Sequence, residues 1–144
     1  MRYVNSRLSS LQAESTINRW KMGEFDARTI TRFMHLSHAV SVIRGWWKNG
    51  NGKDDRRNVG EAFALMHSEL SEALEGARCD AMSDKLPGFS SLEEELADTL
   101  HRIFDFAAGA NLRLAEAFEA KAHYNLTRKD HSLKEREKAG GKDF

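Results

Sequence analysis

The spacing of the apolar residues is the feature that most constrains how this chain can fold. Apolar side chains recur every three or four residues, which is the repeat of a helix with one buried face. Residues that favour strands are sparse and never alternate over the length of a strand. The sequence contains one proline, Pro87, so little interrupts such helices. The sequence therefore predicts an all-α fold, a helical bundle of four to five helices.

Capping signals and glycine-rich breaks predict where the helices begin and end. Asn58 is followed three residues later by Glu61, and Ser90 by Glu93, which is the spacing of a capping box at a helix start. With these signals, the helices are expected at about 6–20, from Asp26 or Thr29 to about Lys48, from Asn58 to about Arg78, from Ser90 to about Ala108, and from about Leu112 to Thr127.

The length of 144 residues fits a single domain spanning 1–144. Within it we expect a charged C-terminal tail at 129–144. The predicted helices carry more apolar residues than one chain of this size can cover, Phe63, Phe104 and Phe118 among them. The sequence therefore predicts a homodimer or tetramer.

Charge and composition exclude several classes of function. Lys plus Arg and Asp plus Glu both number 22, so the formal net charge is zero. Such a chain has no overall field to attract a polyanion, and we expect neither nucleic acid nor a membrane as partner. The single cysteine, Cys79, rules out an intrachain disulfide and is typical of a reducing compartment. Without an apolar N-terminal stretch, the expected location is the cytoplasm.

Two of the predicted helices carry acidic pairs within otherwise apolar stripes. Glu69 and Glu72 are three residues apart, as are Glu95 and Asp98, so each pair shares one helix face. The turn between the helices makes them antiparallel, and packing would bring the four carboxylates together. Carboxylate oxygens without cysteine favour Mg²⁺, or Mn²⁺ as a substitute, over Zn²⁺. Two solvated acidic faces are the alternative.

The last predicted helix carries a complementary polar stripe. Lys121, Asn125 and Arg128 follow the spacing i, i+4, i+7. An ammonium, an amide and a guanidinium on one stripe suit phosphate oxygens, although a solvated face is the alternative. Three further residues are candidate substrate or lid contacts: Asp105, on the face of Asp98 two turns on, His131 in the charged tail, and Trp47 at the end of the second helix.

These residues resemble a known family. Glu69-x-x-Glu72 followed by Glu95-x-x-Asp98 is similar to the E-x-x-E…E-x-x-D signature of MazG-like nucleoside triphosphate pyrophosphohydrolases. Lys121-x-x-x-Asn125-x-x-Arg128 resembles the residues that this family places near the phosphates. The resemblance covers about residues 58–131, roughly half of the chain.

The resemblance implies an all-α enzyme that converts a (d)NTP to the monophosphate and pyrophosphate. It implies that Glu69, Glu72, Glu95 and Asp98 hold two or three Mg²⁺ ions and carry the catalysis, with Lys121, Asn125 and Arg128 on the phosphates. That reaction implies control of the nucleotide pool. If the chain is phage-encoded, the pool is that of the host cytoplasm. The base is left open, and a purine deoxynucleotide such as dGTP is one candidate.

Two other classes of protein remain as alternatives. A ferritin-like di-metal bundle requires repeated Glu-x-x-His pairs, whereas Asp98 with His101 has no second counterpart; His101 is therefore interpreted as structural. A non-enzymatic helical dimerisation or regulatory module predicts acids that are exposed and freely replaceable. Replacing both Glu69 and Glu95 separates this module from the enzyme. Unchanged metal affinity in the double variant would rule out the metal site.

Overall fold

The structure is a computed structural model that describes residues 9–24, 26–48, 50–52 and 57–128. The all-α prediction is confirmed, because the described residues form helices and no strand; an isolated bridge joins Met82 and Ser90. The five helices are α1 (Ser10–Lys21), α2 (Ala27–Ile43), α3 (Val59–Cys79), α4 (Ser91–Gly109) and α5 (Leu114–Thr127).

Side-chain caps explain why most of these helices begin where they do. Ser90 accepts from the backbone N–H of Glu93, whose carboxylate accepts in return from the backbone N–H of Ser90, completing the predicted capping box. Asn58 accepts from the backbone N–H of Glu61 at the start of α3, and Asp26 caps α2 in the same manner. Each cap satisfies an N–H that the helix itself leaves without a partner.

The predicted end of the second helix near Lys48 is wrong. α2 ends at Ile43, five residues earlier, and the chain turns through Arg44–Trp47. Gly45 has a φ of 79°, a left-handed conformation that glycine adopts without steric cost. The turn carries the two neighbouring tryptophans away from the helix and back toward α4.

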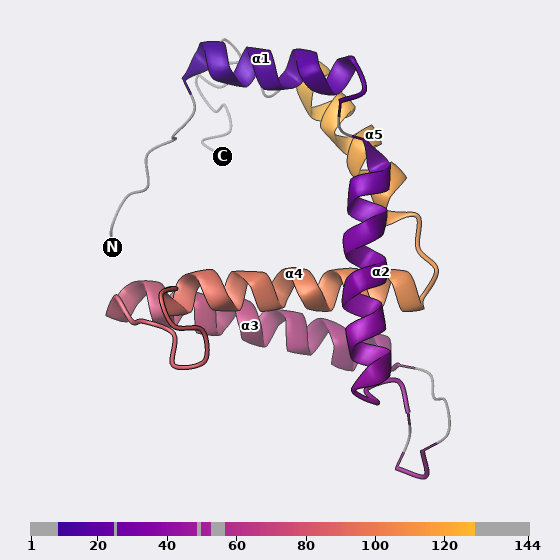
Figure 1. The fold of residues 1–144 in the computed structure, drawn as a ribbon, viewed down its shortest axis with the longest axis vertical. Coiled ribbons are helices and arrows are strands. Elements are labelled where there is room, and N and C mark those ends of the chain that lie inside the picture. Colours follow the sequence, from indigo (N-terminus) through magenta and orange to yellow (C-terminus); the bar gives the residue numbers. More distant parts are fainter. Residues whose placement is uncertain (1–8, 25, 49, 53–56, 129–144) are drawn as a thin grey trace, which may run out of the picture.

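The helices form an open arrangement around an antiparallel pair (Figure 1). α3 and α4 lie side by side and make the most extensive contact between elements, and α2 packs across α4. α5 packs on α2, while α1 approaches the end of α5, where Trp20 meets His123 edge to face. α2 thus joins the α3–α4 pair to the α1–α5 end of the molecule.

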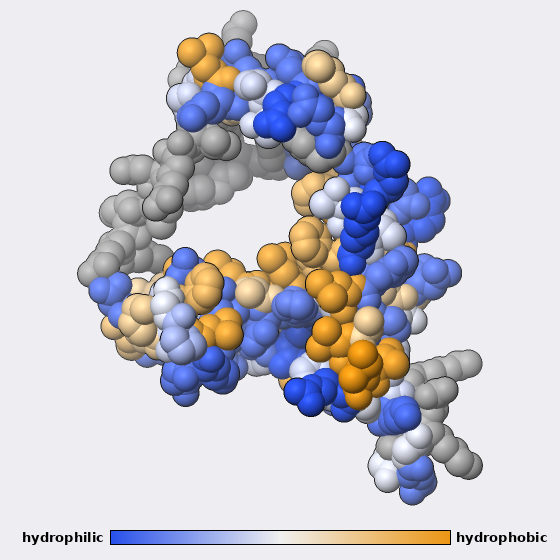
Figure 2. Space-filling model, in the orientation of Figure 1, coloured by the Kyte–Doolittle hydropathy of each residue, from blue (hydrophilic) through white to orange (hydrophobic). Residues whose placement is uncertain are grey.

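The buried apolar core is small for a chain of this length. Met34, Ala107 and Ala115 form its centre, with Phe104 and Leu114 packed around it. Many larger apolar side chains stay at the surface, and Figure 2 shows them gathered over the part of α2 that crosses α4. Exposed members on α3 and α4 include Phe63, Leu70, Leu74, Leu96 and Leu100. Within the described residues, none of the helices has the length and apolarity needed to cross a bilayer.

Candidate functional site

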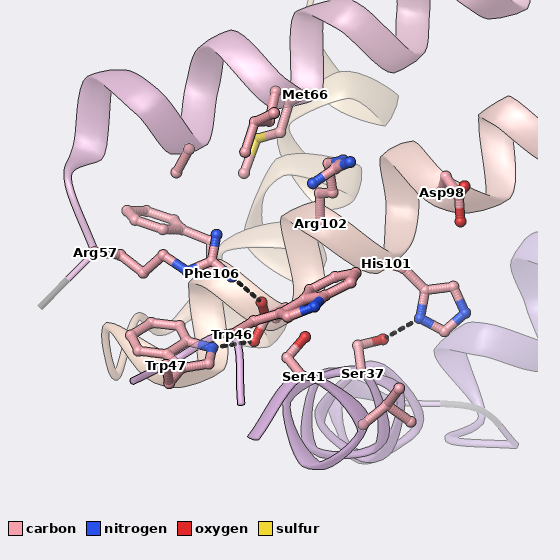
Figure 3. A pocket seen from close by; sticks show the side chains of 14 residues that line it. Ser37, Ser41, Trp46, Trp47, Arg57, Met66, Asp98, His101, Arg102 and Phe106 are labelled. Carbon is pink, nitrogen blue, oxygen red and sulfur yellow. Dashed lines mark hydrogen bonds and ion pairs between the residues drawn. The ribbon is translucent and has the colours of Figure 1, made fainter. Parts of the chain in front are cut away.

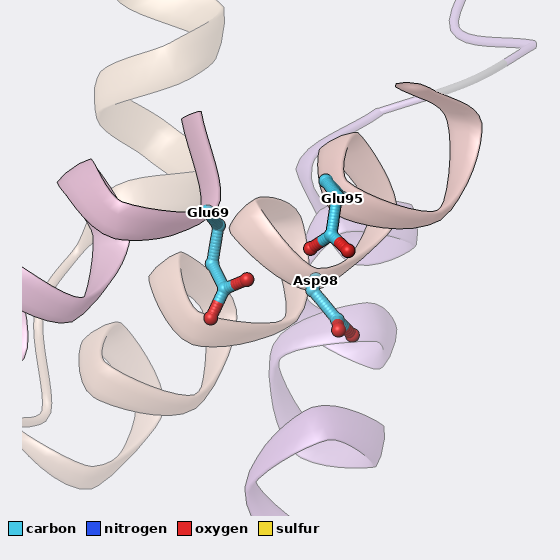
Figure 4. Close-up of side chains that lie close together, drawn as sticks. All are labelled: Glu69, Glu95 and Asp98. Carbon is cyan, nitrogen blue, oxygen red and sulfur yellow. The ribbon is translucent and has the colours of Figure 1, made fainter. Parts of the chain in front are cut away.

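Three of the four predicted acidic residues meet between α3 and α4. Glu69 extends from α3, and Glu95 and Asp98 extend from successive turns of α4 toward the same space (Figure 4). One carboxylate oxygen from each lies within 4.8 Å of the others. Glu69 and Glu95 are buried, each 5% exposed, and Asp98 is more exposed. We call this group the acidic cluster.

Nearby cations compensate the acidic cluster only in part. Arg102, one turn beyond Asp98 on α4, donates to the Glu69 carboxylate. The Lys85 ammonium lies 3.9 Å from an oxygen of Glu95, beyond hydrogen-bond distance. The other Glu95 oxygen is buried and has no hydrogen-bond partner among the residues that the structure describes. A buried carboxylate oxygen without a donor destabilises the folded state. A cation bound to this atom would therefore stabilise the fold most.

The surroundings of Glu95 also change its proton affinity. Burial, the hydrogen bond that a protonated Glu95 would donate to Glu69, and repulsion by the charge on Glu72 together raise the pKa of Glu95 to about 7. A carboxyl with this pKa exchanges its proton near neutral pH, where a divalent cation competes for the same oxygen.

Glu72 stands outside the acidic cluster. It is exposed on α3, one turn beyond Glu69, and is not among the three residues whose oxygens converge. Glu94, which sequence reasoning left aside, is buried instead and accepts from the Ser83 hydroxyl at 2.6 Å and from the Lys85 ammonium at 3.1 Å. These two contacts hold the pKa of Glu94 below its usual range. Glu94 thereby ties the loop between α3 and α4 to α4.

The predicted phosphate stripe lies on a different part of the molecule. Lys121, Asn125 and Arg128 are on the C-terminal half of α5 and its cap, and α5 packs on α2 rather than on the α3–α4 pair. The Lys121 ammonium and the Arg128 guanidinium both lie over the ring of Tyr124, at 4.8 and 5.3 Å from its centroid. Within one chain, the stripe and the acidic cluster are therefore not brought together.

Asp105 and Trp47, both candidate substrate contacts, bind each other. The Asp105 carboxylate accepts from the Trp47 indole N–H at 2.8 Å and lies 2.8 Å from Nδ1 of His38. The Trp47 ring also covers Gly109 so closely that an added Cβ would lie 2.2 Å from it. These contacts fasten the turn after α2 to α4. Both residues also line the cavity described below, so their contact with substrate stays a prediction. His131, the remaining candidate, lies outside the described residues.

A cavity of about 250 Å³ adjoins the acidic cluster. It opens between α2, α3 and α4, and Asp98 and Arg102 line it at the end nearest the cluster (Figure 3). Its apolar lining comes from residues such as Trp46, Met66 and Phe106. Besides Asp98 and Arg102, the polar and charged side chains at its wall are Ser37, Ser41, Arg57, His101 and Asp105.

The donor set of the acidic cluster fits a hard divalent cation. It consists of three carboxylates without histidine or cysteine, as Mg²⁺ and Mn²⁺ prefer. The same composition argues against the repeated Glu-x-x-His ligands of a di-iron bundle. His101 instead lies with Nδ1 at 2.9 Å from the Ser37 hydroxyl.

Several residues of the site were missed from the sequence, and only one had a recognisable signal. Arg102 follows Glu95 and Asp98 at the spacing i, i+3, i+7, so all three share one face of α4. Lys85 belongs to an irregular loop, and Arg57 immediately precedes the cap of α3. No helical periodicity places side chains in such segments.

Comparison with known proteins yields no matching family model, no matching curated protein and no matching solved structure. The acidic cluster and the adjoining cavity are therefore the basis for a functional hypothesis.

Proposed function

We propose that this chain is a metal-dependent nucleoside triphosphate pyrophosphohydrolase, which cleaves a (d)NTP into the monophosphate and pyrophosphate. The observation that carries the proposal is the buried Glu95 oxygen without a partner, placed beside the carboxylates of Glu69 and Asp98. Resemblance of Glu69-x-x-Glu72, Glu95-x-x-Asp98 and the α5 stripe to the MazG-like signature supports the same reaction. Nucleotide-pool control in the cytoplasm is the role that this reaction favours.

The energetics of the acidic cluster support a bound cation. Three carboxylates with oxygens within 4.8 Å repel one another, and Arg102 pairs with only one of them. A divalent ion would satisfy the Glu95 oxygen and offset this repulsion, since its own charge exceeds that of any nearby side chain. Glu69, Glu95 and Asp98 would hold Mg²⁺, or Mn²⁺ as its substitute, and Glu72 would join through a change of rotamer or a second ion.

The remaining contributions come from the chain itself. Mg²⁺ held by Glu69, Glu95 and Asp98 would activate a water and neutralise charge on the phosphate chain. Glu95, whose pKa is raised to about 7 without metal, would release its proton as the cation binds to its oxygen. Arg102 holds Glu69 in position for the cation. The adjoining cavity, which shares Asp98 with the cluster, gives the nucleoside a place beside the cleaved bond.

A second copy of the chain would complete the site. The exposed apolar faces of α3 and α4 favour association, since large apolar patches on a lone protomer are unusual. A partner packed on these faces would bring its own Lys121, Asn125 and Arg128 toward the acidic cluster, which the chain's own α5 does not reach. We therefore include a homodimer or tetramer in the proposal.

A pyrophosphate-release screen tests the reaction directly. All common NTPs and dNTPs are incubated with the protein in Mg²⁺, in Mn²⁺ and in chelator, and both products are quantified. We expect metal-dependent release of equal amounts of monophosphate and pyrophosphate. Glu69→Gln and Glu95→Gln should abolish it, whereas Glu14→Gln, an exposed acid on α1, should leave it unchanged. Absence of turnover by folded wild-type protein in excess metal would contradict the proposal.

The exposed apolar faces also favour one rival, a non-enzymatic dimerisation module. This rival requires no divalent ion. Equal Mg²⁺ affinity in the wild type and in the Glu69→Gln, Glu95→Gln double variant, measured by calorimetry, would favour it over the enzyme.

A further inference from the structure

The cavity beside the acidic cluster has an end that the phosphate chemistry does not use. Figure 3 shows Asp98 on one side of the lining residues, Arg57 on the other and Trp46 between them. If triphosphate binds at the Asp98 end, as the proposed function requires, the nucleobase extends along the cavity toward Arg57. The side chains there determine which base edge is accepted.

Arg57 brings an unsatisfied donor to this end of the cavity. Its Nε is buried and has no hydrogen-bond partner within the described part of the chain, while the side chain as a whole is 20% exposed. The nearest acid is Asp105, 3.8 Å from a terminal guanidinium nitrogen, which is too far for a hydrogen bond. Asp105 uses its other oxygen on Trp47 and His38. The charge of Arg57 is therefore balanced, but its Nε–H lacks an acceptor.

The two neighbouring tryptophans have different tasks at this cavity. Trp47 is fixed by Asp105 and Gly109, and the Arg57 guanidinium lies 5.4 Å from its ring centroid. Trp46 also lines the cavity but is 57% exposed, so its ring is available for stacking on a flat ligand. An aromatic face together with an unpaired guanidinium donor suits a heteroaromatic ring with an acceptor at its edge.

We propose that this end of the cavity selects nucleobases with an oxo group at the edge facing Arg57, namely guanine O6 or thymine and uracil O4. Arginine recognises guanine through its O6 and N7 acceptors. Adenine and cytosine carry an amino group at the same position, so two donors would face each other and the Arg57 Nε–H would stay unpaired. Sites built to hydrogen-bond one group reject an analogue that lacks it.

The test compares matched bases that differ mainly at this position. Deoxynucleoside monophosphates of guanine and 2,6-diaminopurine form one pair, and those of thymine and 5-methylcytosine form the other. Calorimetric titrations into the full chain with Mg²⁺ should show at least about tenfold tighter binding of the oxo member. A preference within the purine pair or the pyrimidine pair alone identifies the ring that fits. Equal affinities within both pairs would overturn the inference.

A variant assigns the preference to Arg57. Arg57→Lys keeps the positive charge next to Asp105 but removes the Nε–H, so the two members of each pair should bind within about threefold of each other. Arg113→Lys, an exposed arginine before α5, is the matched control and should keep the preference. The wild-type comparison stands independently if Arg57→Lys does not fold.

This inference relies on the proposed function to place the base, but different experimental results would contradict the reaction and the base site. An oxo preference in binding with no hydrolysis of any triphosphate contradicts the reaction and supports the base site. Equal binding of both monophosphates in each pair, together with hydrolysis of the corresponding triphosphates at equal rates, overturns the base site and leaves the reaction standing.

Discussion

Two buried acids on α4, Glu95 and Asp105, lie ten residues apart and differ in how far their carboxylates are hydrogen-bonded. Asp105 accepts from the Trp47 indole at 2.8 Å, contacts His38 at 2.8 Å and lies near Arg57. Glu95 faces two other carboxylates; among the described residues its nearest cation is Lys85 at 3.9 Å, and one of its oxygens has no partner there. The two residues are almost equally buried, at 6% and 5% exposed.

Asp105 is therefore an acid that stabilises the fold, whereas Glu95 keeps an oxygen that a ligand would satisfy. Burial alone does not distinguish them, because a buried carboxylate is tolerated wherever donors surround it. The unsatisfied oxygen is the informative observation. Four experiments test whether Glu95 and Asp105 differ in this way.

The largest expected effect is on catalysis at Glu95. Glu95→Gln keeps the size of the side chain but removes the charge that would hold the metal, so the rate of pyrophosphate release should fall at least about a thousandfold. The readout is single-turnover kinetics in saturating Mg²⁺. A fall of less than tenfold would place Glu95 outside the reaction.

Asp105→Ala should instead reduce stability. Removing the carboxylate leaves the Trp47 indole N–H without an acceptor and opens a gap against α4, so the free energy of unfolding should drop by about 3 kcal/mol. Urea unfolding followed by circular dichroism measures this loss. Glu95→Gln in chelator is the matched comparison, and an equal drop there would remove the contrast between the two acids.

The raised pKa of Glu95 predicts how pH acts on metal binding and on stability. Below pH 7 a cation must displace a proton, so Mg²⁺ affinity should rise up to about tenfold from pH 6 to pH 7 and level off above it. Without metal, the folded state holds this proton more tightly than the unfolded chain. The contribution of Glu95 to stability is therefore present at pH 4 and is lost as the pH rises through about 7.

Calorimetry at several pH values measures the affinity, and thermal unfolding in chelator measures the stability. Glu95→Gln should flatten the pH dependence of both quantities between pH 5 and pH 8. An unchanged slope in the variant would assign the titration to another group.

The smallest expected effect distinguishes the two tryptophans. Trp47→Phe keeps a ring over Gly109 but removes the donor to Asp105, which should cost about 1 kcal/mol of stability. Trp46→Phe, at a position 57% exposed, should change stability by less than about 0.5 kcal/mol. Urea midpoints at constant m-value give both numbers, and equal losses would mean that Asp105 gains nothing from the indole.

Much of the fold could be predicted because the signals are local. The caps at Asn58 and Ser90 act within one turn, so the sequence locates the starts of α3 and α4. The end of α2 was misplaced because the apolar spacing continues through Trp46 and Trp47, whereas the left-handed Gly45 has already ended the helix. Apolar periodicity does not register the conformation of a single residue.

The candidate site was predicted less completely because it depends on how whole helices are rotated and placed. The spacing of three puts Glu69 and Glu72 on one face, yet the rotation of α3 against α4 brings only Glu69 to the acidic cluster. The position of α5 follows from its packing on α2, which spacing within α5 does not contain. The phosphate role of Lys121 therefore stays a prediction.

The turn after α2 places two adjacent indoles in unlike surroundings, and this has a practical consequence. Trp47 donates to a buried carboxylate and lies edge-on to His38 at 4.9 Å, so its fluorescence will report whether the turn is docked on α4. Trp46 stands at the cavity, half in water, and its emission will respond to whatever enters. With Trp20 and one of the pair replaced by phenylalanine, the remaining tryptophan would report folding in one variant and occupancy of the cavity in the other.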